Sequence, residues 1–109
     1  GNLDARRDFT DVRDIVRAYV MAVEKCKPGQ QYNICSEKSW KIRDIVDLLI
    51  KLSNKKVKVE LDRSRLRPSD IPVLEGNCTK FREATGWAPL ISFEQTLKDL
   101  LEYWEFNMK

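Results

Sequence analysis

The stretch Gln31-Tyr32-Asn33-Ile34-Cys35 decides the fold class that this sequence predicts, because it lies between two helical patterns. Its length and its β-favouring residues are typical of a short strand. Ahead of it, apolar side chains recur at helical spacing up to Pro28-Gly29. This predicts a helix with an inward stripe made of Val12, Ile15, Val16, Tyr19, Val20 and Val23. A helix, a strand and a second helix in this order favour an α/β fold with a parallel sheet.

The middle of the chain is expected to contain one more helix and one more strand. The helix should run from about Ile42 to Leu52, with its apolar residues facing inward. Lys41 stands at the cap position and has no acceptor in its side chain, so Ser39 is expected to cap instead. Apolar and charged residues alternate over 57–61, which predicts a half-buried strand with one wet face.

The last third of the chain predicts an extended segment followed by two helices. Residues 71–74 should be extended, and a short helix should follow over 79–85. Gly86 can end that helix in the left-handed conformation. Ser92 and Gln95 have the spacing of a capping box, which predicts a final helix whose apolar face contains Phe93, Leu97, Leu100, Leu101 and Trp104.

Composition limits the class of protein. A chain of 109 residues is one domain or part of one. Its 20 basic and 17 acidic side chains give a net charge of only +3, a weak argument for nucleic-acid binding, which usually needs a concentrated basic face. With no histidine and three widely spaced cysteines, a zinc site is not expected, and the thiols should be reduced in the cytoplasm. No apolar run is long enough to span a bilayer.

A binding site is predicted in the stretch 62–70, Asp62-Arg63-Ser64-Arg65-Leu66-Arg67-Pro68-Ser69-Asp70. If the stretch is extended, alternate side chains project from one face, which aligns Arg63, Arg65 and Arg67. Guanidinium groups suit phosphate oxygens in bidentate geometry, and Pro68 favours an extended or turn backbone. Asp70 supplies an acceptor for ribose hydroxyls. The pattern therefore suggests a nucleotide or nucleotide-sugar ligand, with a basic surface loop as the alternative.

The sequence lacks the common patterns of catalysis and cofactor binding. It contains no Gly-x-Gly-x-x-Gly, no Gly-x-x-x-x-Gly-Lys, no tyrosine followed four residues later by lysine, and no histidine. We therefore assign no catalytic, cofactor-binding or metal-binding residue. By itself, the chain should hold a ligand rather than carry out chemistry.

Four ordered segments resemble one family over nearly the whole chain. They are Gly-Asn-Leu-Asp-Ala-Arg-Arg-Asp-Phe-Thr-Asp-Val-Arg-Asp-Ile-Val (1–16), Tyr-Asn-Ile-Cys-Ser (32–36), Arg-Leu-Arg-Pro-Ser-Asp-Ile-Pro-Val-Leu-Glu-Gly (65–76) and Thr-Gly-Trp-Ala-Pro (85–89). The family is the extended short-chain dehydrogenases/reductases that modify GDP-sugars, namely the GDP-4-keto-6-deoxy-D-mannose reductases and the GDP-mannose 4,6-dehydratases. Arg-Asp-Phe and Arg-Pro-Ser-Asp resemble the reductases more closely, but the choice between the two activities stays open.

The resemblance implies that residues 1–109 are the carboxyl-terminal, nucleotide-sugar-binding part of such an enzyme, without its Rossmann half. The strand at 31–35 would lie at the edge of the Rossmann sheet, and residues 57–109 would include a small α/β substrate subdomain. The other half would bind NADP or NAD and supply the catalytic residues, while this segment alone would bind no cofactor. A hydride would then pass between the nicotinamide and C4 of the sugar.

The resemblance also implies roles for five residues of this chain. Arg7 and Arg67 would contact the diphosphate from two sides. Asp70 would accept hydrogen bonds from the ribose hydroxyls, and Pro68 and Ser69 would line the same site. For Arg7, the alternative is a surface ion pair with Asp8, which would contribute little to stability.

The chain departs from the family pattern at Glu37, which stands where the family commonly has glycine, and also at Lys41 and Asn77. Two other functions stay open: a non-enzymatic basic module that binds RNA or another polyanion, and a small helical interaction domain. Because several predicted apolar faces lack partners, the segment should be marginally stable alone or should pair with a second copy through an exposed strand edge.

Overall fold

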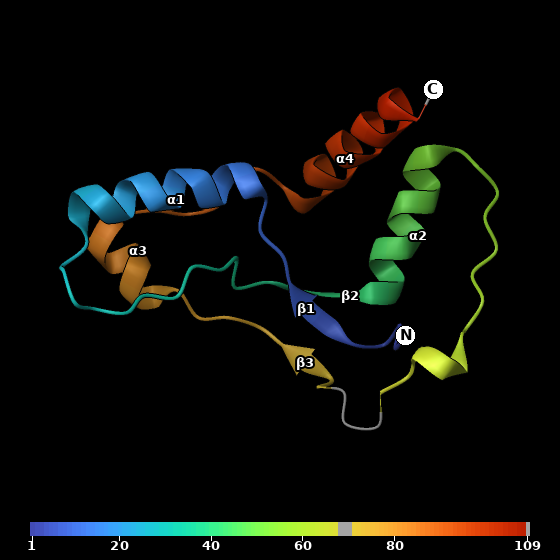
Figure 1. Cartoon of the computed structure of the whole chain (residues 1–109), viewed down its shortest axis with the longest axis horizontal. Helices are drawn as coiled ribbons and strands as arrows, with labels where there is room; N and C mark the ends of the chain where they lie inside the picture. Colours follow the sequence, from blue (N-terminus) through green and yellow to red (C-terminus); the bar gives the residue numbers. More distant parts are fainter. Residues whose placement is uncertain (68–70, 109) are drawn as a thin grey trace.

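A small mixed sheet joins segments from the early, middle and late parts of the chain (Figure 1). The computed structural model describes residues 1–67 and 71–108. Strand β1 (Arg6–Asp8) lies in the centre, antiparallel to β2 (Ser39–Lys41) and parallel to β3 (Val73–Leu74). The predicted α/β class is therefore confirmed. The one parallel pair of the described residues is β1 with β3 rather than a pair that contains residues 31–35.

Four helices form where the apolar spacing predicted them: α1 (Val12–Lys25), α2 (Ile42–Ser53), α3 (Thr79–Thr85) and α4 (Phe93–Asn107). The Ser92 hydroxyl caps α4 by accepting a hydrogen bond from the amide three residues later at 3.1 Å. Gly86 ends α3 with a φ of 74°. Lys41 precedes α2 and provides no side-chain cap. The predicted cap by Ser39 is wrong, because Ser39 lies in β2 and its hydroxyl accepts from the Arg6 guanidinium at 3.1 Å.

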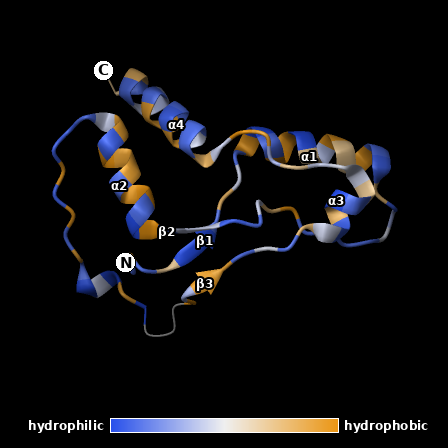
Figure 2. Cartoon of the chain, turned by 180° about the vertical axis from the view of Figure 1, so that it is seen from behind, coloured by the Kyte–Doolittle hydropathy of each residue, from blue (hydrophilic) through white to orange (hydrophobic). Residues whose placement is uncertain are grey.

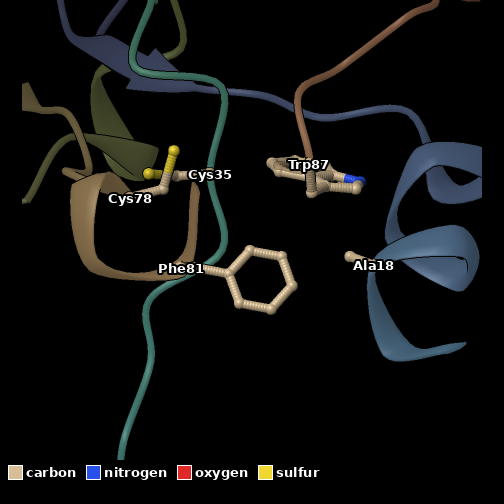
Figure 3. Packing of buried hydrophobic residues seen from close by; sticks show 5 residues of the cluster. All are labelled: Ala18, Cys35, Cys78, Phe81 and Trp87. Carbon is tan, nitrogen blue, oxygen red and sulfur yellow. The ribbon is translucent and has the colours of Figure 1, made fainter. Parts of the chain in front are cut away.

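Trp87 and Phe81 are the largest fully buried side chains among the described residues. Figure 3 shows the cluster that they form with Ala18, Cys35 and Cys78. The two rings meet edge to face with their centroids 5.7 Å apart, and Trp87 Nε1 donates to the Asp14 carbonyl at 3.0 Å. Tyr32 packs against the same cluster. The prediction that Trp87 and Tyr32 are packing residues is confirmed.

A second, aromatic cluster holds the start of α4 against the sheet. The ring of Phe93 stacks on Phe9 with 5.2 Å between the centroids, and Trp40 of β2 tilts onto Phe93 at 5.0 Å. Ile45 of α2 and Leu97 of α4 are buried, and the two helices are in contact. Aromatic and aliphatic side chains therefore fix α4 to both the sheet and α2.

The chain is flat and open. It measures 48 × 37 × 18 Å and has a radius of gyration of 16.8 Å, whereas a compact chain of this length would have about 13 Å. Figure 2 shows many apolar positions (orange) on the helices, and a large share of these side chains are exposed. In the part of the chain that the structure describes, no helix combines the length and the apolar character that a membrane crossing requires.

The apolar stripe of α1 faces solvent, which corrects the predicted inward face. More than half of each side chain is exposed at Val12, Val16, Tyr19, Val20 and Val23. The buried side of α1 carries Asp14 and Ala18 instead, because α3 and Trp87 pack on that side. Leu100 and Trp104, predicted on the apolar face of α4, are also about half exposed, at 47% and 53%. Helical spacing therefore predicted both helices correctly, but it did not predict which face of each helix is buried against the rest of the chain.

Two predicted strands are absent from residues 1–67 and 71–108. Residues 31–36 form no strand pairing, although Ile34 and Cys35 pack at the Trp87 cluster. A strand needs a hydrogen-bonded neighbour, and the sheet of the described residues contains β1, β2 and β3 alone. Residues 57–61 are likewise unpaired, and all of them are exposed. The assignment of 31–35 to the edge of a larger sheet remains a prediction.

A polar network links the starts of α1 and α4. Asp11, the N-cap of α1, is 6% exposed and accepts from Arg13 Nη2 at 2.8 Å and from the Thr96 hydroxyl at 2.7 Å. Arg13 also donates to Asp99 of α4 at 2.9 Å. The Arg13 guanidinium holds the pKa of the Asp11 carboxyl well below its usual range, and it lowers the pKa of Asp99 as well. The orientation of the two helices therefore depends on ionised carboxylates.

Asp11→Asn should make the protein less sensitive to acid. Because the folded pKa of Asp11 lies below its unfolded value of about 3.9, the unfolded state binds more protons at low pH. This contribution to stability is complete above about pH 5 and is lost as the pH falls through 4 and below. Asparagine still caps the helix but does not titrate in this range.

The measurement is urea denaturation at pH 7 and at pH 3. The free energy of unfolding of Asp11→Asn should fall by about 1 kcal/mol less than that of the parent between these two values. Asp47→Asn, at an exposed position of α2, is the control and should behave like the parent. An equal fall in all three proteins would show that Asp11 has no part in the acid sensitivity.

Candidate functional site

A small pocket opens where the parallel strands β1 and β3 end. Its volume is about 270 Å³, and its lining residues are Arg7, Asp8, Thr10, Ile34, Cys35, Leu74, Glu75 and Gly76. The carboxyl ends of neighbouring parallel strands are the usual place for ligands in α/β sheets. The position of this pocket makes it the candidate site.

Arg7 enters the pocket from β1. Its Nη1 donates to the Arg6 carbonyl at 2.7 Å, which helps to fix the guanidinium near the strand. In the strand register Arg7 lies opposite Leu74, and the Arg6 amide donates to the Pro72 carbonyl at 2.8 Å. The polypeptide that returns from the arginine stretch is therefore bonded directly to the strand that carries Arg7.

The other predicted site residues are placed only in part. Arg67 is exposed, and it is not among the described residues that line this pocket. Pro68, Ser69 and Asp70 lie outside the described residues. The structure thus brings Arg7 beside the segment that follows residue 70, and the roles implied for the four other residues remain predictions.

The arginine stretch is not extended over its whole length, which corrects the predicted single arginine face. Residues 63–65 form one turn of 3-10 helix. Asp62 causes the turn, because its carboxylate accepts from the Ser64 amide at 3.0 Å and from the Ser64 hydroxyl at 2.6 Å. Arg65 Nε lies 3.3 Å from the same carboxylate. With three residues per turn, side chains two positions apart point in different directions, so Arg63 and Arg65 do not share a face.

Asp8 holds three segments of the chain together at the pocket. Its Oδ1 accepts from the Ser36 amide at 2.9 Å and from the Ser36 hydroxyl at 2.5 Å. Its Oδ2 accepts from the Glu37 amide at 3.0 Å and from the Gly76 amide at 3.1 Å. The carboxylate therefore fills a nest of backbone N–H groups that could otherwise bind an external anion. Its contacts mark Asp8 as a structural residue of the site rather than as a simple surface ion-pair partner.

Glu37 connects this nest to α3. Its backbone adopts a left-handed φ of 62°, a conformation that residues with a Cβ rarely take. Its Oε1 accepts from the Cys78 amide at 2.8 Å, and its Oε2 lies 3.2 Å from Arg82 Nη1. The hydrogen bond from Cys78 and the nearby Arg82 lower the pKa of the Glu37 carboxyl. The departure from glycine at this position is thus accompanied by a new set of polar contacts.

Gly76 and the Cys35 thiol line the pocket, and a second thiol, Cys78, is buried in the same core cluster as Cys35. A Cβ on Gly76 would lie 2.6 Å from both Cβ and Sγ of Cys35, so only glycine allows this close approach. Burial raises the pKa of the Cys35 thiol, and it raises the pKa of the Cys78 thiol to about 11. Both thiols are free and stay protonated near neutral pH, which agrees with the structural role predicted for Cys35. Among the described residues, no group of three or more His, Cys, Asp or Glu side chains could hold a metal ion.

Sequence reasoning missed the roles of Asp8 and Glu37. Asp8 was considered only as a partner of Arg7, because its bonding partners lie about 30 and 70 positions further along the chain. A signal for Glu37 was available, since a residue that replaces a common glycine often occupies a positive φ. The turn at 63–65 also had a signal, because Asp62 and Ser64 have the spacing of a local side-chain turn.

Comparisons with known proteins agree with this fold. Residues 1–100 match the family described as "GDP-mannose 4,6 dehydratase". The chain is 31% identical over 109 residues to GDP-6-deoxy-D-mannose reductase of Pseudomonas aeruginosa, covering 100% of this chain and 36% of that protein. It is 30% identical over 104 residues to GDP-mannose 4,6 dehydratase 1 of Arabidopsis thaliana, covering 94% of this chain and 28% of that protein. The chain spans about a third of the length of these relatives.

Solved structures show the same likeness. The structure of "RMD from Pseudomonas aeruginosa complexed with NADPH" has a TM-score of 0.91 at 32% identity, over 98% of this chain and 35% of that one. UDP-glucose 4-epimerase from Thermotoga maritima, solved with UDP-glucose, has a TM-score of 0.89 at 27% identity, over 100% of this chain and 34% of that one. These likenesses define the class as the extended short-chain dehydrogenases/reductases that modify nucleotide-sugars. Within that class, the chain belongs to the GDP-mannose 4,6-dehydratase family.

Proposed function

We propose that this chain is the carboxyl-terminal, nucleotide-sugar-binding part of an NADP- or NAD-dependent enzyme that acts on a GDP-sugar. The enzyme would be a GDP-4-keto-6-deoxy-D-mannose reductase or a GDP-mannose 4,6-dehydratase. The part played by this segment is to hold the diphosphate and the ribose so that C4 of the sugar reaches the nicotinamide. Binding energy from the nucleotide then orients the reacting carbon.

The pairing of β1 with β3 is the observation that carries this proposal. It puts Arg7 beside the polypeptide that leaves the arginine stretch, through the Arg6–Pro72 hydrogen bond and the Arg7–Leu74 register. Arg67 precedes β3 in the chain, and β3 pairs with the strand that carries Arg7, which supports a shared role for these two arginines. That arrangement suits a diphosphate, which carries charge on two neighbouring phosphate groups.

The electrostatics of the pocket favour side-chain recognition of the diphosphate. The amides of Ser36, Glu37 and Gly76 already donate to Asp8, so they are not available to a ligand. Guanidinium groups would have to supply the donors. Arginine suits this role because its planar fork matches phosphate oxygens and remains charged at all physiological pH values.

A further part of the enzyme would bind the cofactor. The sequence has no glycine-rich dinucleotide loop, and the amides of residues 36, 37 and 76 donate to Asp8, which supports a cofactor site carried by another part of the enzyme. The exposed stripe of α1 offers an apolar face for a packed neighbouring domain. Together with the short span of this chain relative to its homologues, it supports a separate Rossmann domain that carries NADP or NAD and the catalytic groups. The free thiols fit a cytoplasmic enzyme.

Arg67→Ala tests the proposed function. The change should raise the Kd for GDP by about 10- to 100-fold, because hydrogen bonds to charged groups contribute about 1.5–3 kcal/mol. Isothermal titration calorimetry with the full-length protein is the measurement. Arg63→Ala is the matched control: it also removes an exposed arginine of the stretch, and it should change the Kd by less than about threefold.

The same experiment separates the proposal from polyanion binding. A basic module would lose affinity about equally in both variants and would show a steep dependence on salt. It would also bind inorganic polyphosphate or RNA as well as GDP. An Arg67→Ala protein that binds GDP as tightly as the parent would overturn the assignment to a GDP-sugar site.

A further inference from the structure

Glu37 combines an unfavourable backbone conformation with a side chain that makes several polar contacts. Its left-handed φ of 62° destabilises any residue with a Cβ, and it is one of two such non-glycine residues among those the structure describes. The other, Asn54, is at the C-cap of α2, where asparagine commonly takes this conformation. Glu37 has no comparable local reason, which directs attention to its side chain.

The Glu37 side chain accepts a hydrogen bond from a backbone amide at the start of α3. Cys78 is the N-cap residue of α3 and makes no side-chain capping bond. Its amide instead donates to Glu37 Oε1 at 2.8 Å, while Arg82, one turn into the helix, lies 3.2 Å from Glu37 Oε2. A carboxylate at this end of a helix also interacts favourably with the free N–H groups there. The start of α3 is therefore held by two acceptors: Glu37, 41 positions earlier in the chain, and Asn77, whose Oδ1 accepts from the Thr79 amide at 2.9 Å.

The segment 72–78 is fixed at both of its ends by these contacts. At its start, Pro72 accepts from Arg6, and β3 pairs with β1. At its end, Gly76 donates to Asp8 Oδ2, the same oxygen that accepts from the Glu37 amide. Cys78 then donates to the Glu37 carboxylate. Removing the Glu37 side chain would leave the Asp8 hydrogen bond to Gly76 but remove the contact at Cys78, and so loosen the carboxyl-terminal end of the segment that forms one wall of the pocket around Arg7.

We infer that Glu37 is a positioning residue for the nucleotide-sugar site. Among the described residues, its carboxylate forms hydrogen bonds with Cys78 and Arg82, neither of which lines the pocket. Glu37 therefore acts on the ligand through the placement of residues 72–78 and, through them, of Arg67. This inference rests on the proposed function. It adds to that function a residue that would set affinity without touching the ligand.

Three variants of the full-length protein test the inference, with GDP as the probe in titration calorimetry. Glu37→Gly removes the carboxylate but relaxes the backbone, so the protein should stay folded while its Kd for GDP rises about tenfold. Glu37→Gln keeps an oxygen acceptor for the Cys78 amide and should hold the Kd within about threefold of the parent. Arg82→Ala removes the other hydrogen-bond partner of the Glu37 carboxylate. Its Kd for GDP should lie between those of the other two variants.

The decisive measurement is whether the effects of Glu37→Gly and Arg67→Ala on the Kd for GDP depend on each other. If Glu37 acts by placing the arginine stretch, Glu37→Gly should cost little further affinity in a protein that already carries Arg67→Ala. A role in general stability would instead lower affinity by the same factor in both backgrounds. Melting temperatures recorded in parallel show whether each variant is folded, and Arg82→Ala carries the test if Glu37→Gly does not fold.

The possible results distinguish the positioning role of Glu37 from the proposed function of the chain. Weaker binding in Glu37→Gly, recovery in Glu37→Gln and loss of the effect beside Arg67→Ala support the inference. An unchanged Kd in Glu37→Gly, or in Arg82→Ala where the glycine variant is unfolded, overturns it while leaving the proposed function intact. If Arg67→Ala itself binds GDP like the parent, the proposed function fails, and the positioning role of Glu37 fails with it.

Discussion

Trp87→Ala should lower the free energy of unfolding by about 3–5 kcal/mol, the cost typical of removing a buried large aromatic side chain. Trp87 is fully buried and packs edge to face on Phe81. The guanidinium carbon of Arg17 lies 5.8 Å from the centroid of the Trp87 ring. Its indole nitrogen also donates to the Asp14 carbonyl. Few other residues in 1–67 and 71–108 are buried, so this single cavity should leave much of the protein unfolded at 37 °C.

Chemical denaturation followed by circular dichroism measures this effect. Trp104→Ala is the matched control, because Trp104 is 53% exposed and its loss should cost less than about 1 kcal/mol. Trp87→Phe keeps a ring in the cluster but loses the donor to Asp14, so its stability should lie between that of the parent and that of Trp87→Ala. Equal stabilities of Trp87→Ala and Trp104→Ala would refute the view that Trp87 is the centre of the core.

Gly76→Ala should destabilise the protein by about 2 kcal/mol through overpacking. The new Cβ would stand 2.6 Å from Cβ and Sγ of Cys35, which is itself buried in the cluster around Trp87. Either the segment at Gly76 must move away from Asp8, with the loss of a 3.1 Å hydrogen bond, or Cys35 must move into the core. Both movements also disturb the pocket beside Arg7.

A double-mutant cycle with Cys35→Gly tests this steric origin. Cys35→Gly removes both atoms in the clash, so the cost of Gly76→Ala should fall by more than half in its presence. Gly86→Ala is the comparison, because Gly86 has a φ of 74° and no atom within 4 Å of an added Cβ. Its cost of about 1 kcal/mol should come from the backbone conformation and should add independently to that of Cys35→Gly. Additive costs at Gly76 as well would contradict the steric account.

The helices of this protein could be predicted from sequence, whereas the burial of their faces could not. Helical spacing is a property of the chain alone, and it located α1 and α2 within a residue or two. Burial depends on what covers a face. In α1 the covered side carries Ala18 rather than the more apolar Val16 and Val20, because Trp87 and α3 lie on that side. The same reasoning explains residues 57–61, whose alternation predicted a strand but which pair with no neighbour among the described residues.

For the candidate site, the sequence predicted single side chains, whose roles in binding stay predictions. The Arg-Asp-Phe segment identified Arg7, and the structure places Arg7 in a pocket. The nest around Asp8 was not predictable, because it forms where three segments far apart in sequence converge. Backbone amides have no signature in a sequence, so a site in which a carboxylate satisfies them becomes visible only once the chain is folded.

The nest around Asp8 also has a consequence for the thermodynamics of association. A loop that gains its order only when an anion arrives loses conformational entropy at that moment, and its affinity is reduced accordingly. Here the anion is a side chain of the protein, and the order of residues 36, 37 and 76 is established during folding. A ligand that binds beside Arg7 would therefore not have to order these three amides, and its affinity would not be reduced by that loss of entropy.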